Sequence, residues 1–426
     1  MLNPLSQLKP VNDLTVMVRD QGQFCEIACR IARDAAKVYY CSAREGEFPT
    51  MADMMVGYGM EGLEVVDSIW PYVDRCDLFV YPDLYYGYEQ DYLRSLGKPV
   101  WGAGMGEDLE LDRILLKQIL KSKGMPVNDF EVVVGMEKLR AFLKANEDVY
   151  VKMSKFRGSF ESLHSKTYKE IAPALDEFAH ELGAFQQIAE FICEAPIPDA
   201  AEIGYDGYTV DGQFPKSTLA GIEIKDRAYV GAIKSYASLP SQIKDTNAAL
   251  VDSFKQTMYR GPFSTEVRVP KDKNPYLIDF TARYPSPPNQ LQQEMFSNFT
   301  EILWEGANGR LVDPVPAAKF GALCIITSDF ATKNWQPVEF PKELRGHIKL
   351  NNPVKIKDTY YVVPQPVELC QIGAVSGWGA TMEEAIDQCK EIAGKVSGYG
   401  ICIPTEAFDD AKEEIEKSKA MGVSVL

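Results

Sequence analysis

Short apolar runs alternate with helical patterns through the first hundred residues of this chain. Each run has the length of a buried strand, and the stretches between them have the periodicity of amphipathic helices. Such alternation is typical of a doubly wound parallel sheet with helices on both faces. We therefore expect a small α/β domain at the N-terminus. Its expected strands are residues 14–18, 38–41, 77–81 and 99–102, and its expected helices are residues 26–36, 62–73 and 88–95.

Polar side chains follow two of these strands. Asp20, Gln21 and Gln23 come after the first strand, and Asp83 comes after a later one. Open α/β sheets bind ligands at the carboxyl ends of their strands, so these four side chains are candidates for contact with a substrate. The alternative, that both segments are ordinary turns, is equally consistent with the sequence.

The rest of the chain has the pattern of two further units. A helix over residues 108–123 is followed by a glycine and a proline, which end helices. Residues 127–192 mix strands and helices as in a small α+β lobe, and longer, mostly antiparallel strands follow. The last part is rich in short strands and has one capped helix, which opens at Thr381 with Glu384 three positions later. We expect three domains, over residues 1–107, 108–315 and 316–426.

A hairpin in the second unit carries two acids. Glu266 lies on one expected strand and Asp279 on the next, and a turn with two prolines separates them. Adjacent strands bring two such carboxylates within reach of one hard cation such as Mg²⁺. Acids on half-buried strands commonly just face solvent, so the metal interpretation depends on the residues upstream.

Those upstream residues come in an order that suits a polyphosphate. Lys117 lies on the helix before the small lobe, and Lys152 ends a strand within the lobe. The loop after Lys152 adds further cations and hydroxyls, an apolar strand follows at residues 188–192, and Glu202 comes next. Two lysines, a phosphate loop, an apolar strand and an acid, followed by metal-binding acids, are the parts of a nucleoside triphosphate site.

Composition excludes several other classes of function. The chain has 426 residues and a net charge of −16, so no general attraction to nucleic acid or to anionic membrane is expected. No run approaches the ~18 apolar residues of a membrane-spanning helix. Three histidines and nine scattered cysteines without a C-x-x-C pair disfavour zinc, haem and His-based triads. The cysteines are expected to be reduced thiols in a cytosol-like compartment.

Seven segments of the chain resemble the ATP-grasp superfamily and, within it, phosphoribosylamine-glycine ligase. They occur in that family's order and extend over nearly the whole chain. The segments are residues 77–82, 97–102, 116–126, 149–152, 189–192, 278–283 and 377–385.

The resemblance implies a fold and a chemistry. The fold is mixed α/β and α+β, with a Rossmann-like N-terminal domain, an ATP-grasp domain whose two lobes clamp the nucleotide, and a small β-rich C-terminal domain. The chemistry is ATP-dependent C–N ligation: a carboxylate takes the γ-phosphoryl group, and an amine then displaces phosphate from the acylphosphate. ATP and Mg²⁺ are the implied cofactors, and a small carboxylate and an amine are the implied partners. Positioning and charge neutralisation matter more in such a reaction than a general base.

The resemblance also implies roles for individual residues. It assigns the ATP phosphates to Arg113, Lys117, Lys152, Lys155, Arg157 and Ser159. It assigns adenine to the strand residues Ala189, Glu190 and Ile192, and the ribose to Glu202 if residues 194–199 are an insertion. The metal would be held by Glu266, Asp279 and Thr281, the last in place of the family's asparagine. Arg283, which would face the transferred phosphoryl group, and Lys152 are the candidate catalytic residues.

The segments that would bind substrates depart from the family pattern. Residues 20–26 replace the G-G-R-E-H segment of the phosphoribosylamine ligases, and residues 232–240 replace their G-P-N-T-G-G-M-G loop. We therefore expect a carboxylate-amine ligase with altered substrates, as in a divergent branch of the kind found in bacteriophages. Two alternatives stay open, namely phosphoribosylamine-glycine ligase of purine biosynthesis and a nucleotide-binding module without turnover. The expected location is the cytoplasm, or the host cytoplasm for a phage protein, and the expected state is a monomer or homodimer.

Overall fold

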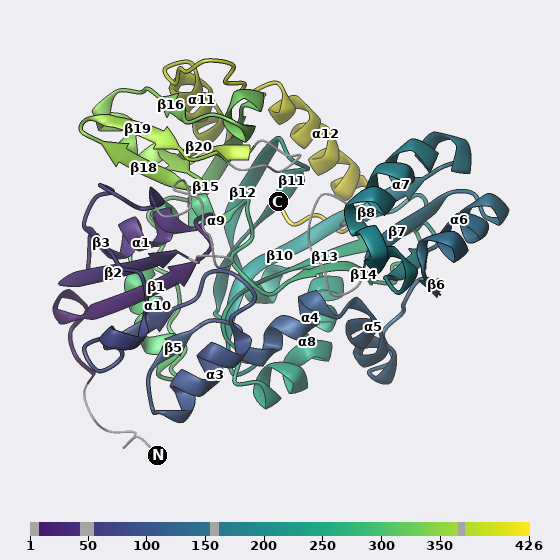
Figure 1. Cartoon of the computed structure of the whole chain (residues 1–426), viewed down its shortest axis with the longest axis horizontal. Helices are drawn as coiled ribbons and strands as arrows, with labels where there is room; N and C mark the ends of the chain where they lie inside the picture. The colour runs from purple at the N-terminus through teal and green to yellow at the C-terminus, as the bar shows by residue number, and fades with distance from the viewer. Residues whose placement is uncertain (1–7, 43–54, 154–161, 365–370) are drawn as a thin grey trace.

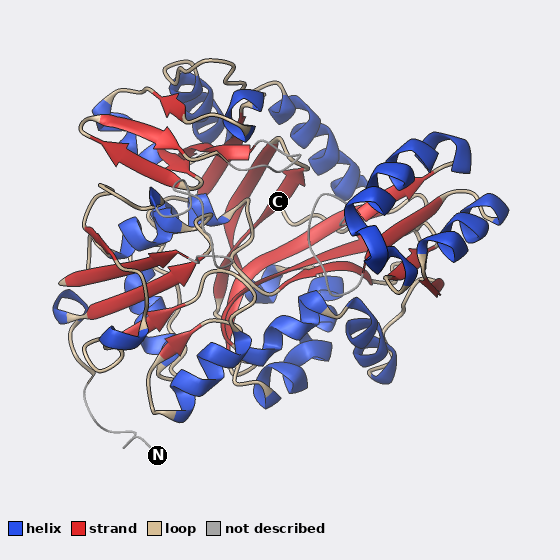
Figure 2. Ribbon diagram, viewed as in Figure 1, coloured by secondary structure: helices blue, strands red, loops and turns tan. Residues whose placement is uncertain are grey.

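The computed structural model describes residues 8–42, 55–153, 162–364 and 371–426. Figure 1 shows the N-terminal sheet and a small four-stranded sheet at opposite ends of the long axis, with a large sheet between them. Helices pack against each of these three sheets (Figure 2), and β16, β19 and β18 form a further small sheet.

The N-terminal unit is a five-stranded parallel sheet in the order β3-β2-β1-β4-β5, which confirms the expected doubly wound architecture. Its central strand β1 is buried because helices pack on both faces, and Val16 and Val18 are fully enclosed. The elements are β1 (Thr15–Asp20), α1 (Cys25–Ile31), β2 (Lys37–Ser42), β3 (Leu63–Val65), β4 (Leu78–Val80), α3 (Gly87–Ser95) and β5 (Val100–Trp101).

The prediction of one helix in this unit is wrong. Residues 62–73 form the edge strand β3 and a short 3₁₀-helix, Trp70–Tyr72. The backbone of β3 pairs in parallel with β2, so pairing to the sheet overrides the weak helical periodicity of this segment.

The expected helix over residues 108–123 is interrupted at one residue. Asp112 has φ −110° and ψ 84°, and its side chain accepts a hydrogen bond from the Leu115 amide at 2.9 Å. It thereby ends α4 (Asp108–Leu111) and caps α5 (Arg113–Ser122). Arg113 and Lys117 lie four residues apart on α5, on one buried face of the helix.

The small lobe is a four-stranded sheet in the order β6-β9-β7-β8, covered by two helices. It has a hydrophobic core of its own, in which Leu139, Leu175 and Phe191 are fully buried. The elements are β6 (Phe130–Val134), α6 (Met136–Ala145), β7 (Val149–Met153), β8 (Ser162–Ser165), α7 (Tyr168–Leu182) and β9 (Glu190–Glu194).

The central sheet has eight strands in the order β14-β13-β10-β11-β12-β15-β20-β17. Its last three strands come from residues beyond 315, so one sheet crosses the expected start of the C-terminal domain; the domain boundaries themselves stay a prediction. The strands are β10 (Ala201–Val210), β11 (Ser217–Ile224), β12 (Ala228–Ser235), β13 (Arg260–Val269), β14 (Tyr276–Thr281), β15 (Phe320–Thr327), β17 (Ile348–Leu350) and β20 (Gln371–Gly379).

The remaining elements pack around this sheet. The capping box expected at Thr381 and Glu384 is present at the start of α11, whereas α12 was not expected from the sequence. Helix α12 crosses β10, β11 and β12 (Figure 1). No helix among the described residues is long and apolar enough to cross a membrane. The elements are α8 (Ser241–Gln256), α9 (Asn289–Met295), α10 (Phe299–Ala307), β16 (Gln336–Val338), β18 (Pro353–Ile356), β19 (Thr359–Val362), α11 (Met382–Ala393) and α12 (Ala407–Ala420).

Candidate functional site

A cavity of ≈ 700 Å³ lies between the four-stranded sheet and the strands β10, β13 and β14. Lys152 of β7 and Glu194 of β9 line it from the small lobe. Glu202, Glu266 and Asp279 line it from the central sheet. The structure therefore brings together, at one cleft, several of the residues that the sequence singles out.

The two metal-binding candidates face each other across the hairpin. Glu266 and Asp279 are partners in the β13–β14 register, at a β-bulge. Burial, together with the negative charge of Asp279, raises the pKa of Glu266 well above its usual range. Asp279 is also held by Arg113, whose Nη1 donates to Oδ1 at 2.8 Å. Thr281 ends β14 and lines the same cavity.

This acid pair fits a magnesium ion bound together with phosphates. The carboxylates supply hard oxygen ligands, and a divalent cation would relieve the repulsion that raises the pKa of Glu266. Over the described ranges, no group of three or more His, Cys, Asp or Glu side chains forms a cage for a metal. Mg²⁺ commonly binds through one or two carboxylates and completes its shell with water and substrate phosphates, so two acids suffice.

Lys117 and Lys152 share one carboxylate that the sequence did not single out. Lys117 Nζ lies 2.8 Å from Oε1 of Glu194, and Lys152 Nζ lies 3.5 Å from Oε2. Lys152 also donates to the carbonyl of Ile278 at 2.5 Å. Burial acts to raise the pKa of Glu194, but the two lysine charges outweigh it, and the pKa lies below its usual value. For Lys117, burial is the stronger effect and lowers its pKa.

Arg283 sits where the N-terminal unit meets the cleft. Its Nε lies 3.4 Å from Oε1 of Glu110 on α4 and 3.9 Å from Oδ1 of Asp83, which follows β4. The other oxygen of Glu110 accepts a hydrogen bond from the Ala282 amide at 2.6 Å. Glu110 thus holds both the guanidinium and the backbone beside it. Asp83, a member of the expected substrate set, lies beside Arg283 but does not itself line the cavity.

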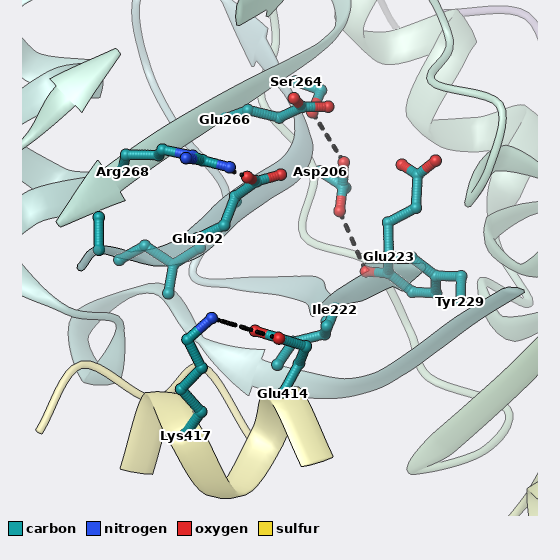
Figure 3. A pocket seen from close by; sticks show the side chains of 14 residues that line it. Glu202, Asp206, Ile222, Glu223, Tyr229, Ser264, Glu266, Arg268, Glu414 and Lys417 are labelled. Atoms are coloured by element: carbon teal, nitrogen blue, oxygen red, sulfur yellow. Dashed lines mark hydrogen bonds and ion pairs between the residues drawn. The ribbon is translucent and has the colours of Figure 1, made fainter. Parts of the chain in front are cut away.

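A side cavity of ≈ 210 Å³ is lined by several of the same residues and reaches α12 (Figure 3). Arg268 donates to Glu202 at 3.2 Å, and Lys417 of α12 pairs with Glu414. Asp206 accepts hydrogen bonds from two hydroxyl groups in its wall, those of Ser264 at 2.8 Å and Tyr229 at 3.0 Å.

Two acids of the side cavity, Asp206 and Glu223, hold their protons more tightly than usual. Burial raises the pKa of Asp206 to about 6, although its two hydrogen bonds oppose the change. Enclosure by the cavity walls and the charges of Asp206 and Asp226 raise the pKa of Glu223. Glu223 itself projects toward the open cavity (Figure 3).

The expected adenine strand lies beside the cleft rather than along it. Strand β9 is paired on both edges, with β6 and with β7, so the backbone of Glu190 and Ile192 is engaged within the sheet. The carbonyl of Ala189 accepts a hydrogen bond from the Gly135 amide at 2.9 Å. None of these three residues lines the described cavity. The segment that does so follows directly: Glu194, Ala195, Pro196 and Ile197.

Other candidates lie away from the described cleft or outside the described residues. Asp20 is fully buried; Oδ1 accepts from the Gly22 amide and the Tyr40 hydroxyl, and Oδ2 accepts from the Phe24 amide. Gln21 and Gln23 are half-buried in the same loop, and neither lines the cavity. Lys155, Arg157 and Ser159 belong to residues that the structure does not describe.

Sequence reasoning missed Glu194, Glu110, Asp206 and Glu223. Glu194 carried one usable signal, because an acid at the end of an apolar strand and just before prolines must find a buried partner. Asp206 carried a similar signal inside an apolar run. Glu110 and Glu223 look like ordinary surface acids in the sequence.

A parallel N-terminal sheet followed by an antiparallel small lobe and a large antiparallel sheet, with a charged cleft between the last two, defines the ATP-grasp fold. Solved structures similar to this chain include a ligase, a synthetase and carboxylases. Phosphoribosylamine-glycine ligase from Thermotoga maritima aligns with a TM-score of 0.69 and 16% identity over 91% of this chain and 98% of its own.

Two other enzymes align at similar levels. The biotin carboxylase domain of 2-oxoglutarate carboxylase from Hydrogenobacter thermophilus, a dimer in complex with MgADP, ADP and bicarbonate, has a TM-score of 0.67 and 14% identity over 96% of this chain and 98% of its own. N5-carboxyaminoimidazole ribonucleotide synthetase from Thermus thermophilus has a TM-score of 0.60 and 13% identity over 90% and 98%. No family model and no curated protein matches the sequence. At these identities the likeness establishes the fold.

Proposed function

We propose that this protein is an ATP-dependent ligase that joins a carboxylate to an amine through an acylphosphate. The observation that carries the proposal is the ≈ 700 Å³ cavity, in which Arg113 and Lys152 face the Glu266 and Asp279 pair. Cations beside a pair of hard-oxygen ligands suit a polyphosphate with its metal. The similarity to ATP-grasp ligases and carboxylases supports the same chemistry.

In this proposal the residues of the cleft divide the work on the phosphates. Lys152 and Arg113 bind phosphate oxygens, and Glu266 and Asp279 hold Mg²⁺, with Thr281 beside them. When bound, the metal neutralises charge on the transferring phosphoryl group. Glu202 remains the candidate for the ribose, and the segment after β9 is the candidate for adenine because it lines the cavity.

Arg283 is the proposed catalytic cation at the transferred phosphoryl group. Glu110 holds its guanidinium from one side, so the positive charge is oriented before the substrate arrives. Preorganised charge of this kind stabilises the developing negative charge of the transition state without reorganisation. Asp83 places the N-terminal unit within 3.9 Å of the same guanidinium, consistent with a substrate bound between the two units.

The acceptor is proposed to differ from that of phosphoribosylamine-glycine ligase. The side cavity is rich in carboxylates, and negative charge beside a phosphate weakens binding unless a cation offsets it. We therefore expect weak or absent activity with glycine and phosphoribosylamine. Formation of glycinamide ribonucleotide at a robust rate would restore the purine-biosynthetic assignment.

The test has a binding arm and a turnover arm. In thermal-shift measurements, Mg²⁺-ADP should raise the melting temperature of the wild type and should raise that of Asp279→Ala much less. Asp272→Ala, in the exposed turn of the same hairpin, is the matched control. Equal stabilisation of all three proteins would remove the metal assignment. Phosphate release from ATP, screened with pools of carboxylates and amines, then distinguishes a ligase from a module that binds nucleotide without turnover.

A further inference from the structure

One carboxylate holds two lysines that come from different parts of the fold. Lys117 is on α5, Lys152 is on β7, and Glu194 on β9 lies 2.8 and 3.5 Å from their ammonium groups. All three side chains are almost completely enclosed, with residue exposures of 5%, 8% and 4%. Asn128 completes the cluster, since its Oδ1 accepts from Lys117 at 3.0 Å and its Nδ2 donates to the carbonyl of Ala195.

The three charged groups differ in their access to the cleft. Lys152 and Glu194 line the ≈ 700 Å³ cavity. Lys117 does not; it lines an adjoining pocket of only ≈ 20 Å³, which Lys152 and Glu194 also line. Glu194 and Lys152 therefore line both spaces, whereas Lys117 lines only the smaller one.

The charge balance of the cluster opposes anions that approach from the cleft. Two lysines and one carboxylate have a single net positive charge. Without Glu194, two positive charges would act on a polyphosphate. The carboxylate also repels phosphate oxygens directly, in surroundings of low dielectric where such effects are large. In return, Glu194 keeps two buried ammonium groups from being left without a partner.

We propose that Glu194 is an internal counter-ion that competes with the nucleotide's phosphates for Lys117 and Lys152, so that phosphate binding must displace part of this pairing. The inference rests on the proposed function, because it takes the cleft to be the ATP site. Glu194 acts here as a positioning residue: it holds both lysines before a ligand binds and sets how many negative charges a ligand needs to compete. Ligands with several phosphates carry enough negative charge to compete with Glu194. The affinity for ligands without phosphate does not depend on this competition.

The experiment compares ligands with and without phosphates on the Glu194→Gln variant. Calorimetric titration at pH 6.5 with inorganic tripolyphosphate and with ATP should give dissociation constants at least about tenfold lower than in the wild type. The constant for adenosine should be unchanged. Damage to the fold would weaken the binding of all three ligands. A gain in affinity that is limited to the two ligands with phosphates is therefore specific to competition for the lysines. Glu194→Asp, which keeps the charge, should return the constants toward wild type.

A second variant tests the opposite change in charge, the addition of a carboxylate to the cluster. Asn128→Asp adds a carboxylate beside Lys117 and should weaken tripolyphosphate binding by about tenfold or more. Glu131→Gln, an exposed acid on the neighbouring strand β6, is the matched control and should change nothing. If the wild type binds no ATP, the proposed function fails. If the wild type binds ATP and neither Glu194→Gln nor Asn128→Asp alters tripolyphosphate affinity, the counter-ion role is overturned while the ATP site stands.

Discussion

Single residues in the cleft depend on partners that are distant in the sequence. Glu194 pairs with a lysine of α5 and a lysine of β7. Arg113 of α5 pairs with Asp279 of β14, and Glu110 of α4 pairs with Arg283. Each pair is at least partly enclosed, so removing one member leaves a charge that water screens poorly. The arrangement of the cations is therefore set by the acids that hold them.

Lys152→Met should raise the dissociation constant for Mg²⁺-ATP by roughly tenfold or more, because a charge-assisted bond to phosphate is typically worth ~1.5–3 kcal/mol. Lys117→Met should have a comparable effect. It should also destabilise the fold, since Glu194 loses its closer partner. Calorimetric titration and urea unfolding measure the two quantities. Lys144→Met, at an exposed lysine on α6, serves as the control. Unchanged constants for both variants would remove these lysines from the site.

Asp20, the last residue of β1, should make the stability of the fold depend on pH. Burial raises the pKa of this carboxyl from 3.8 to about 6. The folded protein thus holds the proton more tightly than the unfolded chain. The contribution of Asp20 to stability is greatest below pH 3.8 and declines as the pH rises through about 6.

The shift of about two units corresponds to roughly 3 kcal/mol. Between pH 4 and pH 7, the free energy of unfolding of the wild type should fall by up to that amount relative to Asp20→Asn. Urea titrations of both proteins across this range measure the difference. A constant difference would show that Asp20 titrates normally.

The sequence predicted the acid pair of the cleft but not Glu194, the carboxylate that pairs with the two lysines. Glu266 and Asp279 lie on consecutive strands joined by a short turn, so their pairing follows from local geometry. Glu194, by contrast, owes its role to Lys117 and Lys152, which approach it through tertiary packing that no local pattern encodes. The predicted adenine strand does not line the described cavity, since the backbone of β9 is paired on both edges, and its role stays a prediction.

At the scale of elements, the capping signal at Thr381 predicted the start of α11 correctly. Thr381 accepts a hydrogen bond from the Glu384 amide at 3.1 Å, and the Glu384 carboxylate accepts from the Thr381 amide at 3.3 Å. The edge strand β3 was mistaken for a helix because its identity depends on pairing with β2. The break at Asp112 was also missed, although this residue is a common helix cap.

Replacing Thr381 by alanine should lower the free energy of unfolding by ~1 kcal/mol, the usual cost of losing such a cap. The reason is local, since the amides of the first turn of α11 lose their acceptor. Urea unfolding measures the change, and Thr381→Ser should recover most of it. Equal stabilities of wild type and Thr381→Ala would show that the cap contributes nothing.

At the scale of the whole molecule, one sheet joins the proposed nucleotide cleft to the C-terminal strands. Strand β12 pairs with β15 through residues 228–232, and β20 and β17 extend the sheet further. The largest hydrophobic core includes residues of the N-terminal sheet, the central sheet and the C-terminal strands. The sequence predicted the three kinds of unit, but the shared sheet depends on long-range pairing that composition does not reveal.

A chain that ends at residue 315 should therefore fail to form a soluble, nucleotide-binding protein. Its strand β12 would present an unpaired apolar edge, which favours aggregation. Size-exclusion chromatography and thermal shift with Mg²⁺-ADP test this expectation. A monomeric truncated chain that binds Mg²⁺-ADP as the full chain does would show that the C-terminal strands are dispensable for the cleft.

The shared sheet also has a consequence for the order of events during protein synthesis. The strands that complete the sheet emerge from the ribosome after the strands that line the cleft. At roughly 5–20 residues per second, the hundred or so residues from β15 to α12 take on the order of 5–20 s to be made. We expect β12 to have a free edge until β15 is made, and this edge to be a binding site for chaperones on translating ribosomes. We also expect the cleft to gain its affinity for nucleotide only once β15, β17 and β20 have joined the sheet.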